Sequence, residues 1–475
     1  MRTAEQYREK LRSMRKNVYI DGELVERDDP RLIPGQNVVA ETFNFAADPK
    51  YADLMTAKSH ITGKTINRFT HIHQSVDDLL KKQEMTRVLC QHVGGCIQRC
   101  MGIDAMNALS VVTKDCDLAM GTNYHERFLK YLEYFQENDL VGNCAQTDVK
   151  GDRMKRPHEQ VDPDLYLRVV EKRSDGIVVR GAKAHNTIAP YADEIIVVPT
   201  RFMTEKEADW SVAFAVPADT EGVYLICRAT APRQRKKFKA PIEQYGSADS
   251  LTVFDNVFVP WERVFLCGET RFAGQLAIQF ANYHRHSYTG CKPATTDILM
   301  GATALVAEYN GIAKAPHVRD KLAHMVTVAE LVYGTGMASA MKAYKAASGT
   351  YVPDFVYTNV ARYHAGVNIY HEHEILADIA GGLPATLPPE GDFLNPTTKD
   401  FLNKYIMRNP EISADNVHRC FRLCSDLLCS AHAGVMQVAG VHGGGSPIME
   451  KIGIMSAYDI NSKKKIAKRL AGIEE

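Results

Sequence analysis

Apolar and polar residues follow a helical period in the first part of the chain, residues 1–144. In VDDLLKKQEMTRVLCQHV (76–93) and ERFLKYLEYFQEND (126–139), apolar residues recur at spacings of three and four. That spacing places them on one face of a helix. Asn138 and Gly142 lie near the end of the second run and favour a helix stop there. We therefore predict an N-terminal helical domain.

The pattern changes in the second part, residues 145–280. Short runs rich in Val, Ile and aromatic residues are bounded by Gly, Pro and Asp, as is typical of β-strands. The residues Asp219 to Gly222 suit a turn between two of these runs. Their close spacing predicts a middle antiparallel β domain, a barrel or a sandwich, without alternating strands and helices. The runs are GIVVRGAKAH (176–185), EIIVVPT (194–200), WSVAFAVPA (210–218), GVYLICRA (222–229) and SLTVFDNVFVP (250–260).

Long helical patterns return in the third part, residues 281–475. They cover residues 297–315, 317–347 and 414–439 and predict a C-terminal helix bundle. The resulting α+β order, helical then β then helical, resembles the acyl-CoA dehydrogenase architecture. A fold of this kind does not by itself determine a function.

Composition and charge narrow the class of protein. The chain has 475 residues, and its 57 basic residues balance its 57 acidic ones. Nucleic-acid binding usually requires a basic excess or a basic face, so nucleic acid is not an expected partner. No apolar run approaches the length of a membrane span, and the charged N-terminus lacks the apolar core of a signal peptide. We therefore expect a cytoplasmic protein that does not contact membranes.

Two of the 11 scattered cysteines, Cys96 and Cys100, are four positions apart in the segment GGCIQRCMGIDAMNA. On a helix, residues at this spacing share one face, so two thiolates there can bind one metal centre. Taken alone, the spacing favours the simpler interpretation of two buried cysteines. Cys420 and Cys424 have the same spacing, with Cys429 just beyond. We interpret those three as core residues of the last long helix.

A second cluster of reactive residues occurs where the strand pattern gives way to helix. Cofactor and substrate pockets commonly form at such junctions between domains. One histidine is usually structural, and this cluster leaves a functional and a structural interpretation both open. The segment is NYHRHSYTGCK, with His284, His286, Tyr288, Cys291 and Lys292.

CIQRC, followed much later by YHRHSYTGCK, resembles the iron–sulfur motif of the flavoenzyme family of 4-hydroxybutyryl-CoA dehydratase and 4-hydroxyphenylacetate 3-monooxygenase. TGKTINRFTHIHQS, FDNVFVPWERVF and HGGGSP are similar to further family segments, so the resemblance covers most of the chain. It implies a [4Fe-4S] cluster held by Cys96, Cys100, His284 and Cys291. Iron at the imidazole corner is exchangeable and can act as a Lewis acid on a substrate hydroxyl. The aromatic monooxygenase relatives lack this ligand set.

The same resemblance implies FAD as a second cofactor, and the chain has no Rossmann fingerprint that would bind it another way. From the residues alone, TDVKGDR is also typical of a solvated turn. Gly381 and Gly382 resemble the glycine pair with which acyl-CoA dehydrogenase-like proteins approach the FAD of a neighbouring subunit, although alone they indicate a helix stop. The likeness to the family also implies a homotetramer. The implied flavin contacts are Gln146, Thr147, Asp148, Lys150, Asp152, Arg153, His185, Asn186 and Thr187.

The resemblance further implies a lyase that catalyses radical dehydration of a hydroxyacyl-CoA, with 4-hydroxybutyryl-CoA converted to crotonyl-CoA, and a vinylacetyl-CoA isomerase activity. His284 is then both a ligand and a candidate base, and Tyr288 is the acid for the leaving hydroxyl. Gln98, Thr187 and Lys292 would orient substrate and flavin. The basic run 233–239 (RQRKKFK) suits CoA phosphates, although we favour a solvated loop.

Two departures from the family pattern weaken the assignment of the substrate. The dehydratases have a glutamate where this chain has Asp249 and a second where it has Ala439. A shorter carboxylate can still act as an acid or base, whereas an alanine side chain cannot. His442 and the acidic residues near it are unranked substitutes.

Two other functions remain open from the sequence. One is an FAD-dependent aromatic hydroxylase, and the other is an electron carrier or structural flavoprotein without catalysis. The four matched ligand positions favour the dehydratase over the hydroxylase. His, Tyr and Lys residues interleaved with the ligands argue against a non-catalytic carrier.

Overall fold

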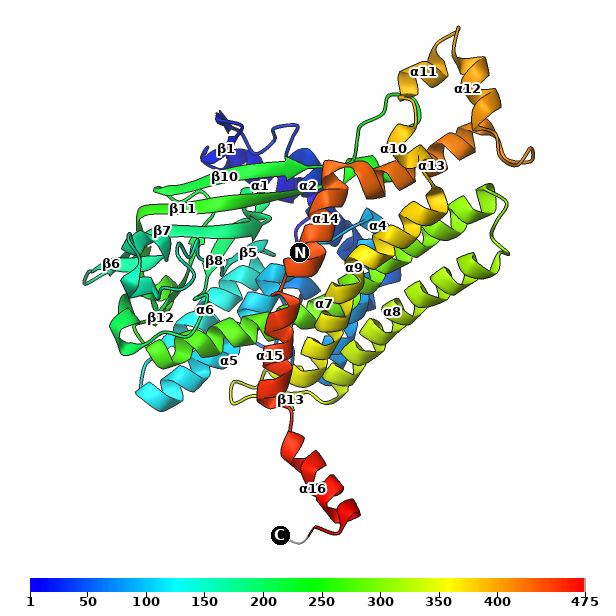
Figure 1. The fold of residues 1–475 in the computed structure, drawn as a ribbon. Coiled ribbons are helices and arrows are strands. Elements are labelled where there is room, and N and C mark those ends of the chain that lie inside the picture. Colours follow the sequence, from blue (N-terminus) through cyan, green and yellow to red (C-terminus); the bar gives the residue numbers. More distant parts are fainter. Residues whose placement is uncertain (474–475) are drawn as a thin grey trace.

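Two sheets carry the middle of the chain, and helices from both ends pack beside them in the computed structural model, which describes residues 1–473 (Figure 1). The larger sheet has the order β2-β1-β10-β11-β7-β6, and the smaller has the order β12-β9-β8-β5. The rings of Phe214 in β9 and Phe254 in β11 lie 5.8 Å apart, so the two sheets pack face to face. The strands are β1 (Val18–Ile20), β2 (Glu23–Val25), β3 (Thr56–Lys58), β4 (Thr65–Asn67), β5 (Gly142–Ala145), β6 (Arg168–Lys172), β7 (Gly176–Thr187), β8 (Glu194–Val197), β9 (Val212–Pro217), β10 (Val223–Thr230), β11 (Ser247–Pro260), β12 (Val264–Cys267), β13 (Tyr344–Lys345) and β14 (Tyr351–Val352).

All five strand runs predicted from the sequence are strands, namely β7 to β11. Most neighbouring strands are antiparallel, as predicted, but β1 pairs parallel with β10, and β5 pairs parallel with β8. β1 belongs to the N-terminal part of the chain and β5 lies at its boundary with the middle part, whereas all pairings among β6 to β12 are antiparallel, as predicted for the middle region. Both parallel pairs join segments that are distant along the chain, and a local hydrophobic pattern does not record such pairings.

The N-terminal helices begin and end close to the predicted positions. α4 has Ser75 as its N-cap, which accepts a hydrogen bond from the backbone of Asp78, and it stops at Gly94 with a left-handed backbone. α6 has Asn138 as its C-cap. The helices are α1 (Ala4–Ser13), α2 (Ile33–Ala47), α3 (Ala52–Met55), α4 (Val76–Val93), α5 (Cys100–Met120) and α6 (Tyr124–Glu137).

The C-terminal part is built around α7, a helix of 40 residues that packs against α4, α5, α8 and α9. α7 begins at Thr270, so the segment NYHRHSYTGCK lies inside this helix. The expectation that it marks the end of the β region was wrong, because the helix starts well before it. The remaining helices are α7 (Thr270–Tyr309), α8 (Pro316–Met341), α9 (Phe355–Ala380), α10 (Leu383–Thr386), α11 (Glu390–Leu394), α12 (Lys399–Ile406), α13 (Ala414–Cys429), α14 (Ala431–His442), α15 (Pro447–Ala457) and α16 (Ile460–Ala471).

The run 414–439, predicted as one helix, is two helices. α13 ends at Cys429, and the Ser430 side chain caps α14 by accepting from the backbone of Ala433. Cys420 and Cys424 are buried in the core, as predicted, whereas Cys429 is exposed at the helix end. The prediction of a core position for Cys429 was therefore wrong.

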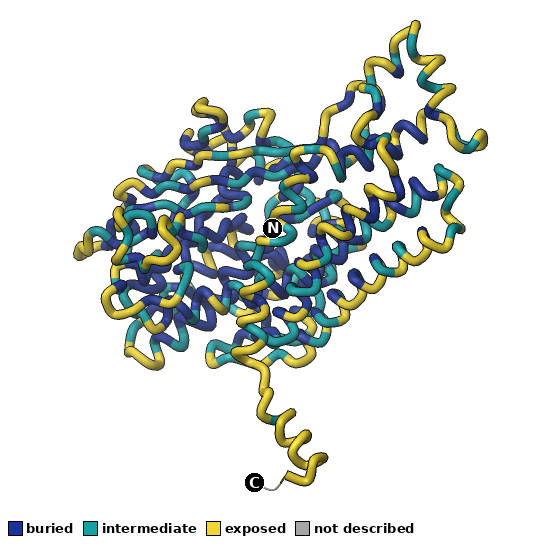
Figure 2. Tube along the Cα trace, viewed as in Figure 1, coloured by how far each residue is buried: buried dark blue, intermediate teal, exposed yellow. Residues whose placement is uncertain are grey.

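Burial is concentrated in the two sheets and in the helices that pack on them, as Figure 2 shows in dark blue. The last helix, α16, extends away from this body with its surface exposed. Within residues 1–473, none of the helices has the length and apolar character needed to cross a membrane.

Candidate functional site

Cys96 and Cys100 lie on either side of a sharp change in backbone direction. Cys100 is the first residue of α5, and Cys96 lies in the loop before it. Between them, Gln98 has a φ of 64°, a left-handed conformation that an α-helix does not accommodate. The prediction that both thiols share one helical face was therefore wrong. Gln98 is held by its side chain, which donates to the Gly246 carbonyl at 2.9 Å and accepts from the Tyr191 hydroxyl at 2.6 Å.

Cys291, on the facing helix α7, completes a group of thiols. Its thiol lies close enough to the thiols of Cys96 and of Cys90 in α4 to influence their pKa values. Cys291 and burial raise the pKa of Cys96, while Cys90 and burial raise the pKa of Cys291. Burial together with the Asp104 charge raises the pKa of Cys100. Thiols in this environment stay protonated unless a positive centre stabilises their thiolates. Sequence reasoning missed Cys90, although it precedes Cys96 by only six positions.

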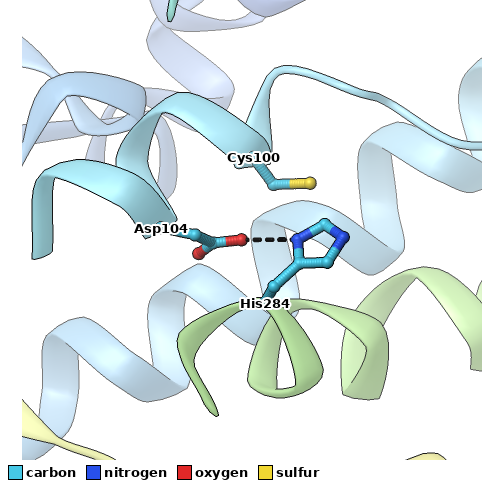
Figure 3. Close-up of side chains that lie close together, drawn as sticks. All are labelled: Cys100, Asp104 and His284. Carbon is cyan, nitrogen blue, oxygen red and sulfur yellow. Dashed lines mark hydrogen bonds and ion pairs between the residues drawn. The ribbon is translucent and has the colours of Figure 1, made fainter. Parts of the chain in front are cut away.

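His284 reaches the same place from α7. Its Nδ1 atom lies 2.9 Å from a carboxylate oxygen of Asp104, which belongs to α5. Ligand atoms of Cys100, Asp104 and His284 all lie within 4.8 Å of one another (Figure 3). The structure thus brings together the four residues predicted to hold a cluster, around the start of α5 and the middle of α7.

Tyr288 lies one helical turn beyond His284, and the two rings are 5.3 Å apart and perpendicular. Its hydroxyl donates to the Ala439 carbonyl at 3.3 Å, and the Arg362 guanidinium lies 4.5 Å from the ring centre. A Cβ atom at Gly443 would meet the Tyr288 hydroxyl at 1.7 Å. The HGGGSP segment therefore needs glycine to pack this closely over Tyr288.

Glu450 of α15 is a buried acid behind the same glycine segment. Both of its carboxylate oxygens lack a hydrogen-bond partner among the described residues, and the Arg285 Nε atom is 4.0 Å away. Burial raises the pKa of Glu450, while Arg362 and Arg285 oppose the shift. Glu450 is the acidic residue nearest to His442 along the chain and so belongs to the unranked substitutes named above, but its burial depends on how α15 packs onto α9.

The other predicted catalytic residues are engaged with protein partners. Lys292 forms a buried ion pair with Glu372 of α9. Asp249 of β11 accepts a hydrogen bond of 2.5 Å from the Thr187 hydroxyl on the adjacent strand β7, and burial raises the pKa of Asp249. The charge of Asp249 contributes to the raised pKa of Cys96, which places it on the thiol side. His286 is buried with neither ring nitrogen hydrogen-bonded in the described chain, as suits a structural residue.

The predicted flavin segment divides into buried and open parts. Asp148 is paired with Lys183 at 2.9 Å, and both side chains are buried. Lys150, with a φ of 75°, lies near Lys183, Arg153 and Arg201, whose charges together with burial lower the pKa of Lys150. Because Asp148 is already paired, positive charge is in excess here, which suits a bound phosphate. Sequence reasoning missed Lys183 and Arg201.

The remaining flavin candidates flank this cationic group. Gln146 donates to the Ala277 carbonyl of α7 at 3.1 Å, and the Thr147 carbonyl accepts from a backbone N–H of β7. Asn186 is buried, whereas Asp152 and His185 are exposed. His185 has a φ of 61°, and strained non-glycine residues of this kind cluster at functional sites.

Gly381 is the C-cap of α9 with a φ of 68°, which confirms the predicted helix stop. It lines an open cleft of about 370 Å³ together with His373 and Cys429, and Gly382 beside it is exposed. The contact with the flavin of a neighbouring subunit stays a prediction.

The basic run 233–239 forms a loop, as predicted, but it is not fully solvated. Arg235 is buried in ion pairs with Glu243 and Asp426, while Lys236 and Lys237 are exposed. The prediction that the whole loop is solvated was therefore wrong for Arg235, because its acidic partners lie outside the basic run.

Comparison with known proteins gives consistent matches along nearly the whole chain. The family model described as 4-hydroxyphenylacetate 3-hydroxylase N terminal matches residues 3–266, and its C-terminal counterpart matches residues 273–472. The sequence is 45% identical to 4-hydroxybutyryl-CoA dehydratase/vinylacetyl-CoA-Delta-isomerase of Clostridium aminobutyricum, over 99% of both chains. It is 28% identical to the 4-hydroxyphenylacetate 3-monooxygenase oxygenase component of Geobacillus sp. (strain PA-9), over 98% of this chain and 96% of that protein.

Solved structures show the same two likenesses. The oxygen-tolerant archaeal 4-hydroxybutyryl-CoA dehydratase from N. maritimus superposes with a TM-score of 0.95 at 38% identity, covering 100% of this chain and 95% of that one. The oxygenase component of 4-hydroxyphenylacetate 3-monooxygenase complexed with FAD superposes with a TM-score of 0.90 at 26% identity, covering 99% and 98%.

Proposed function

The chain belongs to the 4-hydroxyphenylacetate 3-hydroxylase family, and we propose that it is an FAD- and [4Fe-4S]-dependent hydro-lyase that dehydrates a hydroxyacyl-CoA. The proposed substrate is 4-hydroxybutyryl-CoA, the product is crotonyl-CoA, and vinylacetyl-CoA is isomerised at the same site. The 45% identity to an enzyme with both named activities supports this choice. The observation that carries it is the convergence of Cys96, Cys100, Cys291 and His284 at one place.

The donor set suits an iron–sulfur cluster. The three buried thiols, whose pKa values are all raised, would become thiolates beside a strongly positive centre, and thiolates are the usual ligands of such clusters. Cys100 and His284 already approach within the range that one metal centre spans. The three thiols and the imidazole would therefore hold the cluster.

The cationic group around Lys150 suits the phosphates of FAD. Gln146, Thr147 and Asn186 lie beside that group and would line the flavin. A related protein of the same fold is complexed with FAD, which supports this assignment. Asp148 would contribute to FAD binding only through Lys183, because its carboxylate is paired with that residue.

When bound, the flavin would supply one-electron chemistry, and the cluster would supply a Lewis-acidic iron for the substrate hydroxyl. Tyr288 keeps its phenolic proton at neutral pH, because burial raises its pKa, and would donate it to the leaving hydroxyl. Asp249 would be the proton acceptor on the thiol side, and His284 would accept a proton only while its Nε2 atom is not bound to the cluster. Arg362, over the Tyr288 ring, would stabilise negative charge that develops on the phenol oxygen.

The second candidate function is an FAD-dependent aromatic hydroxylase. The 28% identity to a monooxygenase component favours it. The thiol group argues against it, because oxygenation by reduced flavin needs no cluster ligands.

Anaerobic purification followed by iron, sulfide and flavin analysis tests the cofactors. We expect about four irons and about four sulfides per chain, as one [4Fe-4S] cluster requires, together with FAD. A panel of hydroxyacyl-CoA thioesters assayed without oxygen then tests the substrate. FAD without iron, combined with hydroxylation of a phenol, would establish the hydroxylase instead.

We also propose the acyl-CoA dehydrogenase-like arrangement, a homotetramer and a cytoplasmic location. Exposed apolar residues on the last two helices support association between chains, since large exposed apolar faces commonly mark interfaces. These residues are Ile448, Met449, Ile452, Met455, Ile466 and Leu470. Light scattering of the purified holoprotein tests the proposed tetramer.

A further inference from the structure

Asp104 is a fully buried carboxylate at the centre of a polar network that joins three helices. Its oxygens accept hydrogen bonds from His284 Nδ1 at 2.9 Å and from the Ser287 hydroxyl at 3.0 Å, both on α7. The Lys82 ammonium of α4 donates to the same carboxylate, and it also donates to the Tyr283 carbonyl at 2.9 Å. Lys82 and Asp104 are both fully shielded from solvent.

Both oxygens of Asp104 are occupied by protein donors. One oxygen receives Lys82 and Ser287, and the other receives His284 and Ser287. Because the single Ser287 hydroxyl proton is shared between the two oxygens, three donors fill most of the roughly four lone-pair sites of the carboxylate. Although Asp104 lies within reach of a metal beside Cys100, it is placed to orient a ligand and not to be one.

The hydrogen bond to Asp104 determines which nitrogen of His284 is available. An ionised carboxylate only accepts, so the imidazole must carry its proton on Nδ1. Among the described residues, no hydrogen bond is made by Nε2, and Figure 3 shows this nitrogen on the side of the ring away from Asp104. The ring is held further by stacking on Phe280, with centroids 5.5 Å apart.

We propose that Asp104 is the positioning residue of His284: it fixes the tautomer with the proton on Nδ1 and so presents the Nε2 lone pair to the cluster. Carboxylate partners of histidine ligands commonly act in this way. This inference rests on the proposed function. It adds that α4 helps to position the histidine ligand, because Lys82 of this helix neutralises Asp104 and allows an ionised carboxylate at a fully buried position.

The charge of Asp104 matters as much as its shape. In an Asp104→Asn variant, the amide can turn its NH2 group toward His284 Nδ1. The histidine would then carry its proton on Nε2, the nitrogen that the cluster needs. The single substitution also leaves Lys82 buried without its partner, whereas the double variant Lys82→Met/Asp104→Asn removes both charges.

The first test uses the unaltered holoprotein. Histidine labelled with 15N at Nε2 only, or at Nδ1 only, is incorporated, and pulsed EPR of the reduced cluster measures the nitrogen coupling. We expect strong coupling from Nε2 and weak coupling from Nδ1. Strong coupling from Nδ1 would overturn the inference, whatever the variants do.

The second test compares variants after anaerobic purification. We expect Lys82→Met/Asp104→Asn to lose about 10- to 100-fold in iron retention against a chelator and to lose its strong Nε2 coupling. Asp426→Asn, which alters a buried carboxylate on α13 away from this network, should keep both. Unchanged Nε2 coupling in a folded double variant would sink the inference alone, whereas absence of iron from the unaltered protein would sink the proposed function.

Discussion

Two pairs of cysteines have the same spacing in this chain but very different surroundings. Cys96 and Cys100 lie on either side of the left-handed residue Gln98, and they face Cys291. Cys420 and Cys424 lie on one continuous helix, α13, one turn apart and buried in the core. The spacing alone therefore does not identify a metal site, because what faces the pair decides its chemistry.

The polar groups around each pair explain the difference. The first pair lies beside a buried ion pair of Lys82 and Asp104, with His284 bound to the same carboxylate. The second pair lies in an apolar cluster with Phe421 and Leu427. Thiols in apolar surroundings act as small hydrophobic residues. Substitutions in one region therefore have a natural control in the other.

The largest contrast is expected between Cys100→Ala and Cys424→Ala. Loss of a thiolate ligand should remove most of the iron and reduce dehydration to background, because activity requires the intact cluster. Loss of the Cys424 thiol should leave iron and activity unchanged and cost about 1 kcal/mol of stability through the small cavity left behind. Iron analysis and anaerobic turnover of both variants measure this. Equal iron content in the two variants would remove the distinction between the regions.

Local sequence patterns predict the helices and strands well, but they do not distinguish the two cysteine pairs. Residues 76–93 are helical as predicted, because their apolar spacing and the Ser75 cap are local features. The break at Gln98 was missed, because it depends on hydrogen bonds to Tyr191 and Gly246, far away along the chain. The resemblance to a family motif supplied the predicted ligands, whereas the contacts of Asp104 and the burial of Glu450 depend on how helices pack together.

A second contrast, of intermediate size, compares two tyrosines of α7. Tyr288 lies beside His284, and Tyr309 lies at the other end of the helix near Cys420. If Tyr288 donates the proton to the leaving hydroxyl, Tyr288→Phe should lower the dehydration rate by about 10²- to 10⁴-fold with iron and FAD retained. Tyr309→Phe should leave the rate within about twofold. Normal turnover of Tyr288→Phe would remove Tyr288 from the chemistry.

The two regions also contain buried acids that differ in pairing. Asp426 of α13 forms an ion pair with Arg235, which is also paired with Glu243. Asp426→Asn should lower the free energy of unfolding by about 2 kcal/mol, because Arg235 loses one of its two buried partners. Urea denaturation of the holoprotein at pH 7 measures this. An unchanged midpoint would indicate that Glu243 alone neutralises Arg235.

Glu450, near the first region, should respond with the opposite sign and a smaller effect. Its carboxylate oxygens have no hydrogen-bond partner in the described chain, and burial raises its pKa above the usual 4.5. Below pH 4.5 the carboxyl group is protonated whether the chain is folded or unfolded, so it lowers the free energy of unfolding very little. As the pH rises through the pKa of the folded state, this free energy falls, because ionisation of the buried group is unfavourable. Glu450→Gln should therefore raise the unfolding free energy by about 1 kcal/mol at pH 7 and by almost nothing at pH 4. An equal increase in the free energy of unfolding at both pH values would show that the ionised carboxylate of Glu450 does not destabilise the fold. Asp426 and Glu450 would then differ in their packing and not in their charge.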